Sequence, residues 1–250
     1  MHISGNTILI TGGGSGIGRG LAEAFHRQGN QVIISGRRAD ALAEVTDANP
    51  GMAALTVDMT DPGSINALAA AAIAAYPALN AVINNAGIMV NEDILAAPDY
   101  LGTAEATIAT NLLGPIRLTA ALLPHLLAQP RASILTVSSG LAFVPLAATP
   151  TYSATKAAIH SYSQALRHQL RSTNVEVLEI APPYVQTTLQ GAHQASDPHA
   201  MPLAAFIEET MVQLAAVPEH GEVLVERVGM LRYAEQRGQA DEVFAAINPA

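Results

Sequence analysis

The sequence predicts a single α/β domain in which one parallel sheet is covered by helices on both faces. Short apolar runs of strand length alternate with helical patterns along the whole chain, which is typical of a doubly wound sheet. The 250 residues suit one domain, because α/β domains reach this length without dividing. No repeat, linker or low-complexity segment interrupts the alternation. We therefore expect residues 1–250 to form one domain with seven strands.

The first strand and the first helix flank a glycine-rich turn. An apolar run at residues 7–10 precedes T-G-G-G-S-G-I-G at residues 11–18, and a helical pattern continues to about residue 28. Glycines there let the backbone turn tightly and approach a pyrophosphate, which a helix N-terminus binds well. The alternative is a flexible loop. The turn predicts a dinucleotide site formed by Gly12, Ser15, Gly16, Ile17 and Gly18.

The second strand, at residues 31–35, is followed by Gly36, Arg37 and Arg38. An acidic residue at this place would bind the ribose hydroxyls of NAD. A glycine leaves room, and two arginines can bind a 2′-phosphate through paired hydrogen bonds. The sequence therefore favours NADP(H) over NAD, with a basic pair that merely flanks a helix as the alternative.

The third and fourth strands end in further candidates for cofactor contacts. The third, at residues 53–57, leads to Asp58 and Met59, and the Asp58 carboxylate could accept a hydrogen bond from an adenine amino group. It could equally cap the helix predicted at residues 62–76. The fourth strand precedes small and amide side chains, which suit backbone that lies close to a ligand. The residues that we place in the cofactor site here are Asp58, Met59, Asn85, Ala86 and Gly87.

Tyr152 and Lys156 lie four positions apart, so a helix places both on one face. A nearby ammonium stabilises a phenolate, which predicts that the pKa of Tyr152 falls below its usual value of about 10. Such a phenol can exchange a proton with a substrate oxygen. Lys156 is the only lysine in the chain, which favours a function that a planar guanidinium cannot fulfil. Ser139 follows a buried strand at residues 133–137 and could hold the same oxygen.

A long helix is predicted at residues 103–128 and is interrupted at Gly114 and Pro115. Proline has no N–H to donate to the carbonyl of Asn111, so a kink is expected there. We infer that the freed carbonyl could hold a water molecule that meets the Lys156 ammonium. The alternative is a bend that serves packing alone.

The last part of the chain contains a sixth strand (residues 175–180) and a segment without clear period (residues 184–205), which suits a mobile lid. A helix at 203–216, a strand at 222–225 and two short helices follow. No lysine or arginine occurs between Tyr184 and Pro218, so a substrate anion would find no cation there. We therefore predict a neutral, fairly apolar substrate, or else apolar residues that pack the lid or a subunit contact. The expected substrate contacts are Leu141, Phe143, Tyr184 and Leu189.

Composition excludes several classes of function. The net charge of −9 argues against nucleic acid and against acidic carrier proteins as partners. The absence of cysteine excludes thiolate chemistry, and the eight histidines show no metal-ligand spacing. The N-terminus does not resemble a secretory signal, and no run of apolar residues is long enough to span a membrane. The sequence thus predicts a cytoplasmic protein with no metal and no membrane contact.

Together, TGGGSGIG at 11–18, NNAG at 84–87, Asn111, Ser139 and YSATK at 152–156 resemble the compact short-chain dehydrogenase/reductases over roughly residues 5–190. This resemblance implies a Rossmann sheet of seven parallel strands, a nicotinamide cofactor and a homo-oligomer, either dimer or tetramer. It also implies a catalytic tetrad in which the tyrosine is the acid/base, the serine orients the carbonyl, the lysine lowers the tyrosine's pKa and binds ribose, and the asparagine supports a water relay. The tetrad residues are Asn111, Ser139, Tyr152 and Lys156.

The chain departs from the family pattern in two places. Pro182 and Pro183 replace the usual Pro-Gly after the sixth strand, and the C-terminus resembles a divergent bacterial branch named after a D-alanine transfer operon. We place Pro182, Val185 and Thr187 in the cofactor site. The expected function is that of an NADP(H)-dependent carbonyl reductase or alcohol dehydrogenase. An acyl-thioester reductase and a non-catalytic NADP(H)-binding regulator are the alternatives.

Overall fold

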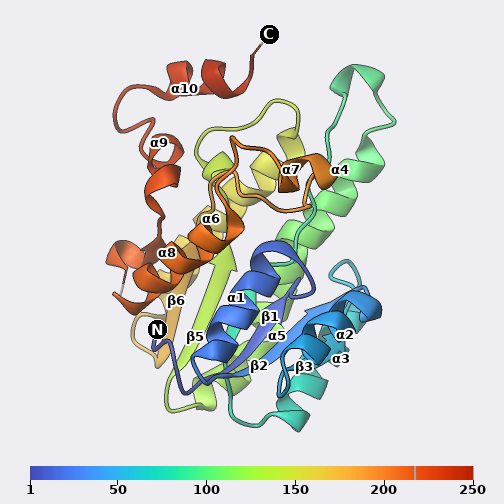
Figure 1. The fold of residues 1–250 in the computed structure, drawn as a ribbon, viewed down its shortest axis with the longest axis vertical. Coiled ribbons are helices and arrows are strands. Elements are labelled where there is room, and N and C mark those ends of the chain that lie inside the picture. The colour runs from blue at the N-terminus through green and yellow to red at the C-terminus, as the bar shows by residue number, and fades with distance from the viewer. Residues whose placement is uncertain (217, 250) are drawn as a thin grey trace.

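The computed structural model describes residues 1–216 and 218–249, and Figure 1 shows strands enclosed by helices in front and behind. In the described residues seven strands form one sheet in the order β3-β2-β1-β4-β5-β6-β7. Every neighbouring pair is parallel. The strand order reverses direction beside β1, which is where ligands bind in open α/β sheets. The predicted doubly wound sheet is confirmed.

The strands are short and mostly buried, because helices cover both faces of the sheet. Their bounds are β1 Thr7–Thr11, β2 Gln31–Gly36, β3 Ala53–Thr56, β4 Leu79–Asn84, β5 Ala132–Val137, β6 Val175–Ile180 and β7 Glu222–Val223. Only β7 differs clearly from the prediction of a strand at 222–225. It pairs with β6 through two residues, and a 3₁₀ turn begins at Glu226.

The helices divide into two layers, each with its own apolar core. Leu21, Leu42 and Phe206 represent the layer of α1, α2 and α8, while Leu68 and Leu122 represent the layer of α3, α5 and α6. The helices are α1 Gly16–Arg27, α2 Ala39–Ala48, α3 Pro62–Ala75, α4 Leu101–Ile108, α5 Gly114–Ala128, α6 Pro150–Leu170, α7 Ala192–Ala195, α8 Leu203–Ala215, α9 Gly229–Arg232 and α10 Ala240–Ile247.

The interruption predicted at Gly114 and Pro115 takes the form of a π-helical turn. This turn, Ala109–Leu113, joins α4 to α5 and contains Asn111. A π turn within a helix is a known feature of functional sites. The run Leu101–Ala128 is also long and apolar enough to pass a length-and-composition test for a membrane span, a test that core helices pass as well. Here Leu118, Leu122 and Leu126 pack into the core.

The C-terminal segment packs onto the loop that follows β5. Val144 of that loop forms a small apolar cluster with Leu231, Ala234 and Val243 of the C-terminal segment. The side chain of Asn248 also accepts a hydrogen bond from the backbone N–H of Ala147. In Figure 1 this segment, drawn in red, runs along the upper part of the molecule beyond the sheet.

The segment predicted as a lid, residues 184–205, contains α7 and the start of α8. Val185 and Met201 form an isolated parallel bridge. Gln194, which is buried, donates a hydrogen bond to the carbonyl of Val185 at 2.8 Å. The segment is therefore folded against the carboxyl ends of the strands. Its predicted mobility stays a prediction.

Candidate active site

A continuous groove runs along the carboxyl ends of the central strands. It consists of two adjoining cavities of about 490 and 440 Å³, a size typical of ligand sites. The cavities share residues of the glycine-rich turn, of the loop after β2 and of the loop after β4. The shared residues are Gly12, Ser15, Arg37, Arg38, Ala86, Gly87 and Ile88.

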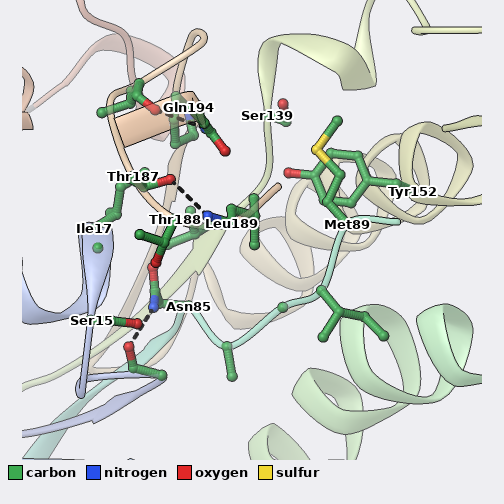
Figure 2. Close-up of a pocket in the computed structure, with 18 of the residues that line it drawn as sticks. Ser15, Ile17, Asn85, Met89, Ser139, Tyr152, Thr187, Thr188, Leu189 and Gln194 are labelled. Carbon is green, nitrogen blue, oxygen red and sulfur yellow. Dashed lines mark hydrogen bonds between the residues drawn. The ribbon is translucent and has the colours of Figure 1, made fainter. Parts of the chain in front are cut away.

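The glycine-rich turn forms the floor of the groove because two of its glycines adopt left-handed backbone conformations. Gly12 has φ +69° and Gly16 has φ +53°. A Cβ on Gly12 would lie 2.8 Å from the amide nitrogen of Asn85, whose side chain donates to the carbonyl of Thr11 at 2.9 Å. Figure 2 shows Asn85 beside the turn that carries Ser15. The close approach of backbone that the sequence predicts is therefore present.

Gly18 has a different role from the one predicted. A Cβ there would lie 2.2 Å from the carbonyl oxygen of Gly12, so Gly18 lets α1 pack against the turn. It does not border either cavity, whereas Ser15, Gly16 and Ile17 do. The third glycine thus supports the site through packing rather than ligand contact, which agrees with the general role of this position.

The smaller cavity ends at Arg37 and Arg38, which are both exposed. Across residues 1–216 and 218–249, neither guanidinium has a hydrogen bond or an ion pair. Asp58 and Met59 line the same cavity. Two arginines whose donors are not used within the protein are therefore available to an anionic group at this end of the groove.

The Asp58 carboxylate has a local function that the sequence analysis missed. Its Oδ1 accepts hydrogen bonds from the backbone N–H of Thr60 at 2.9 Å and from the Thr60 hydroxyl at 2.8 Å. These bonds, together with the charge of Arg37, lower the pKa of Asp58. The alternative prediction that Asp58 caps the next helix is wrong, because Asp61 caps α3 by accepting from the N–H of Gly63. Asp58 instead stabilises the turn that precedes α3.

Tyr152 and Ser139 both border the larger cavity and are almost fully buried. Tyr152 comes from the first turn of α6, and Ser139 lies where β5 passes into a 3₁₀ turn. Figure 2 shows the Tyr152 hydroxyl directed into the cavity, with Ser139 on the same side. Burial raises the pKa of Tyr152 to about 12, and the Ser139 hydroxyl acts in the lowering direction. The phenol is thus protonated at neutral pH.

The single lysine is also buried, and its ammonium is hydrogen-bonded to the backbone rather than to the tyrosine hydroxyl. Lys156 Nζ donates a 2.7 Å hydrogen bond to the carbonyl of Val137 and lies 5.5 Å from the centroid of the Tyr152 ring. Burial lowers the pKa of Lys156 to about 8, and the negative charge of Glu179 raises it. The predicted lowering of the tyrosine's pKa is therefore wrong for this structure, because the loss of hydration on burial raises the pKa and outweighs the lowering effect of the Ser139 hydroxyl.

Asn111 holds the loop after β4 in place. Its Oδ1 accepts from the N–H of Ile88 at 2.9 Å, and its Nδ2 donates to the carbonyl of Ile88 at 2.8 Å. The same Nδ2 approaches the Thr155 hydroxyl at 3.4 Å, which links this loop to α6. Asn111 is buried and does not border the cavity. Its predicted water relay stays a prediction, and its visible role is to position backbone next to Lys156.

The residues predicted for the cofactor site after β6 lie on the larger cavity. Pro182, Val185 and Thr187 border it, as do Tyr152 and Lys156. A Cβ on Gly16 would lie 3.4 Å from the Thr187 side chain, so this loop packs close to the glycine-rich turn. Figure 2 places Thr187 and Ile17 on the same side of the cavity.

Of the four predicted substrate contacts, only Leu189 borders the cavity. The ring of Phe143 packs edge-on against His160, with 4.8 Å between centroids, and below the guanidinium of Arg232. The Tyr184 hydroxyl donates to Asp197 at 3.1 Å, and Leu141 donates its N–H to the Ser139 hydroxyl. Leu141, Phe143 and Tyr184 do not border the cavity, and their role as substrate contacts stays a prediction.

Several residues that line the substrate end were missed. Ile88, Met89 and Val90 continue the chain after NNAG, so an apolar run at a strand's carboxyl end was the available signal. Pro183, Thr188 and Gln194 also border the cavity. For these three the sequence offers no comparable pattern, because the folding of residues 184–205 brings them there.

Within residues 1–216 and 218–249, no group of three histidine or acidic side chains is placed to hold a metal ion. The candidate groups at this site are therefore hydroxyls, one ammonium, two guanidiniums and backbone amides. Together they suit an elongated anionic ligand that ends beside a proton donor.

Comparison with known proteins agrees with this geometry. Residues 6–198 match the family described as short chain dehydrogenase. The uncharacterised oxidoreductase DltE of Bacillus subtilis is 42% identical, with 99% of this chain and 98% of that protein covered. Dehydrogenase/reductase SDR family member 7B of Bos taurus is 31% identical, with 75% of this chain and 60% of that protein covered.

Solved structures give the same result. A short-chain dehydrogenase from Burkholderia cenocepacia in complex with NADP has a TM-score of 0.82 and is 25% identical. The match covers 100% of this chain and 100% of that chain. The closed form of a serine dehydrogenase complexed with NADP+ has a TM-score of 0.75 at 26% identity, with 85% of this chain and 90% of that chain covered. On its fold, its site and the extent of these matches, the chain belongs to the short-chain dehydrogenase/reductase family of oxidoreductases.

Proposed function

We propose that the protein is an NADP(H)-dependent oxidoreductase that interconverts a neutral, fairly apolar ketone and the corresponding secondary alcohol. The observation that carries this proposal is the larger cavity, which brings the hydroxyls of Tyr152 and Ser139 together with Lys156. The same groove extends to Arg37 and Arg38. One ligand could therefore reach from the two arginines to the catalytic hydroxyls.

The residues of the groove fit a nicotinamide dinucleotide. Left-handed Gly12 and Gly16 leave room for a pyrophosphate at the N-terminus of α1, and the unpaired guanidiniums of Arg37 and Arg38 suit a 2′-phosphate. The two similar structures named above contain NADP or NADP+, which supports the same choice. When bound, such a cofactor supplies or accepts the hydride.

Tyr152 performs the proton transfer in this proposal. A buried phenol with a raised pKa keeps its proton, so in the direction of reduction it donates that proton to the carbonyl oxygen. Ser139 provides a second hydroxyl on the same side of the cavity and orients that oxygen. The Lys156 ammonium stabilises negative charge that develops on the phenol, since Nζ lies 5.5 Å from the ring. In the direction of oxidation the same groups act in reverse.

The lining of the substrate end favours an apolar molecule. Met89, Val90 and Leu189 border the cavity there, and no lysine or arginine occurs in residues 184–218. A substrate carboxylate or phosphate would compete with the cofactor for Lys156, which is the cavity's cation at this end. Acyl-thioester reduction is the second candidate, and a non-catalytic NADP(H)-binding regulator is the third.

We also propose a cytoplasmic homo-oligomer. Leu101, Ile108 and Leu113 are exposed on the run from α4 to α5, which supports association through this surface. Size-exclusion chromatography with light scattering tests it, and a monomer at micromolar concentration would contradict it.

A substrate panel tests the function. Purified protein is assayed with NADPH and with NADH against apolar ketones, small keto acids and a 3-oxoacyl thioester, and with NADP+ against secondary alcohols. We expect turnover of apolar ketones and alcohols with preference for NADP(H). Preference for a keto acid would overturn the substrate class, and preference for the thioester would favour the second candidate. Tight NADPH binding without turnover of any compound would favour the regulator.

A further inference from the structure

One ridge of α6 continues beyond the catalytic pair. Tyr152, Lys156, His160 and Gln164 follow one another at intervals of four residues, so they lie along one side of the helix. The first two belong to the cavity described above. The third, His160, contacts a buried carboxylate on the neighbouring strand, and no step of the proposed reaction uses it.

That carboxylate belongs to Glu179 of β6, which is only 1% exposed. Both of its oxygens lie within hydrogen-bond distance of His160 Nδ1, at 2.9 and 3.0 Å. His160 Nε2 is in turn 3.2 Å from the side-chain nitrogen of Gln164. A buried carboxylate is costly unless nearby groups compensate its charge, so a chain that retains one needs a reason to do so.

The sheet register places Glu179 close to Lys156. In the pairing of β5 with β6, Glu179 lies opposite Thr136. The next residue of β5 is Val137, and its carbonyl accepts a hydrogen bond from the Lys156 ammonium. The ammonium and the carboxylate make no direct ion pair, but the negative charge acts on Lys156 through the low-dielectric interior. The only direct partner of Lys156 Nζ in the described residues is a neutral carbonyl.

The other charged groups near His160 already have partners within the protein. Glu222 lies opposite Glu179 in β7, and both of its oxygens accept from Arg232 at 2.7 and 3.0 Å. Arg232 also covers the ring of Phe143, which packs on His160. Arg167 donates to backbone carbonyls of Val177 and Gly221. Among the described side chains, Glu179 is the carboxylate whose charge acts on Lys156, and the same charge also acts on Arg232.

We propose that Glu179 and His160 are positioning residues of the active site: the buried carboxylate keeps Lys156 in its ammonium form, and the imidazole N–H holds that carboxylate in place. Their importance for turnover rests on the function proposed above, whereas their effect on the protonation of Lys156 does not. Since burial drives Lys156 toward its neutral form, an opposing negative charge is what retains the cation at neutral pH.

The experiment uses the fact that Lys156 is the only lysine. Lysine labelled with carbon-13 at Cε gives one side-chain resonance, and its chemical shift against pH reports the ionisation of Lys156 without substrate or turnover. In the unmodified protein we expect a midpoint near 8. Glu179→Gln keeps the volume and removes the charge, so the midpoint should fall by about one pH unit.

Two variants of His160 separate charge from packing. His160→Asn retains an N–H donor near the position of Nδ1 and should leave the midpoint close to that of the unmodified protein. His160→Leu removes the donor, so the Glu179 carboxylate loses the partner that holds it near Lys156. The midpoint should then fall as it does in Glu179→Gln. Glu222→Gln is the matched control, because it removes the neighbouring carboxylate that Arg232 already balances, and it should change the midpoint little.

A midpoint in Glu179→Gln equal to that of the unmodified protein overturns the proposal, as does an equal fall in Glu222→Gln. If Glu179→Gln does not fold, as judged by circular dichroism, the comparison of His160→Asn with His160→Leu decides, and equal midpoints in these two overturn it. In an active preparation, the alkaline limb of the pH profile of kcat/KM should move with the midpoint. A shifted midpoint without any turnover would leave the positioning role intact and contradict the proposed function.

Discussion

The two ends of the groove differ in how far their charged and polar groups are exposed to solvent. At the adenosine end, Arg37, Arg38 and Asp58 are exposed at the surface. At the catalytic end, Ser139, Tyr152 and Lys156 are each less than 10% exposed. An exposed charge is hydrated whether or not a ligand is present, whereas a buried one loses hydration when the chain folds. The pKa values reflect this, since burial is the largest cause of the shifts at Tyr152 and Lys156.

This difference implies that the buried end lowers the stability of the fold more than the exposed end does. The exposed arginines cost the fold little, so their contribution is expected in cofactor affinity alone. The buried tyrosine and lysine are expected to affect both turnover and the dependence of stability on pH. Substitutions at the exposed end should therefore change cofactor affinity, and substitutions at the buried end should change turnover and the pH dependence of stability.

The largest effect is expected from Tyr152→Phe. Loss of the hydroxyl removes the proton donor but keeps the ring, so kcat should fall by about 10² to 10⁴. Binding of NADPH, measured by fluorescence titration, should change little because the ring still lines the cavity. Tyr162→Phe, in the same helix and outside both cavities, serves as a control. Near-normal turnover in Tyr152→Phe would show that another group supplies the proton.

Lys156→Met should remove a pH dependence from the folding stability. Burial holds the pKa of Lys156 near 8, against 10.5 for the ordinary side chain, so the unfolded chain binds more protons between these values. The stability of the unmodified protein should therefore rise with pH from about 8 to 10.5, and the penalty is present in full below 8. Chemical denaturation of both proteins across this window measures it.

The stability gap between Lys156→Met and the unmodified protein should change by roughly 3 kcal/mol over that window, in favour of the unmodified protein as pH rises. Tyr152 acts in the opposite direction above pH 10, because its raised pKa favours the folded protein only while the phenol stays protonated. Since both proteins retain Tyr152, its contribution cancels in the difference. A gap that does not depend on pH would contradict the burial of a charged lysine.

Arg37→Ala should affect cofactor choice alone. A charge-assisted hydrogen bond to a phosphate contributes about 1.5 to 3 kcal/mol, which corresponds to roughly a tenfold to hundredfold rise in the KM for NADPH. The KM for NADH should hardly change, because NADH has no 2′-phosphate. Steady-state kinetics with both cofactors measure the ratio. Equal increases for both would mean that Arg37 does not bind the 2′-phosphate.

The smallest effect is expected at the substrate end. Leu189 borders the cavity but is 40% exposed, so Leu189→Ala should raise the KM for an apolar ketone only a few-fold, about 1 kcal/mol. Tyr184→Phe removes the hydroxyl that bonds Asp197 and does not touch the cavity, so its KM should match that of the unmodified protein. A larger change in Tyr184→Phe than in Leu189→Ala would restore Tyr184 as a substrate contact and exclude Leu189.

The sequence placed Arg37, Arg38 and Asp58 beside the glycine-rich turn, as the structure does, because the signals at this end are local. The turn at residues 11–18 depends on glycines that are adjacent in the chain, and the left-handed conformations of Gly12 and Gly16 follow from that arrangement. Arg37, Arg38 and Asp58 each lie at the end of a parallel strand, and parallel strands bring their carboxyl ends to one edge of the sheet. Alternation of strands and helices likewise sufficed for the fold class and the sheet.

At the catalytic end, the sequence predicted which residues come together but not how strongly they are buried or where the Lys156 ammonium points. The four-residue spacing of Tyr152 and Lys156 places them on one helix face whatever surrounds them. Whether the ammonium lowers the pKa of the tyrosine depends on where Nζ points and on how much water reaches it. Both are set by the carbonyl of Val137 and by the helices that cover β5, which are remote in sequence.

The sequence by itself determined the α/β fold, the glycine-rich turn, the pair of arginines at one end of the groove and the candidate hydroxyls of Tyr152 and Ser139, because short-range spacing encodes them. Only the tertiary structure decided that Phe143 and Tyr184 do not border the cavity, that Ile88, Met89 and Val90 line it, and that Glu179 pairs with Thr136, next to the residue that binds Lys156. Those outcomes depend on the register of β5 with β6 and on the packing of residues 184–205 and of the C-terminal segment. Such contacts join distant parts of the chain and leave no periodic signal in it.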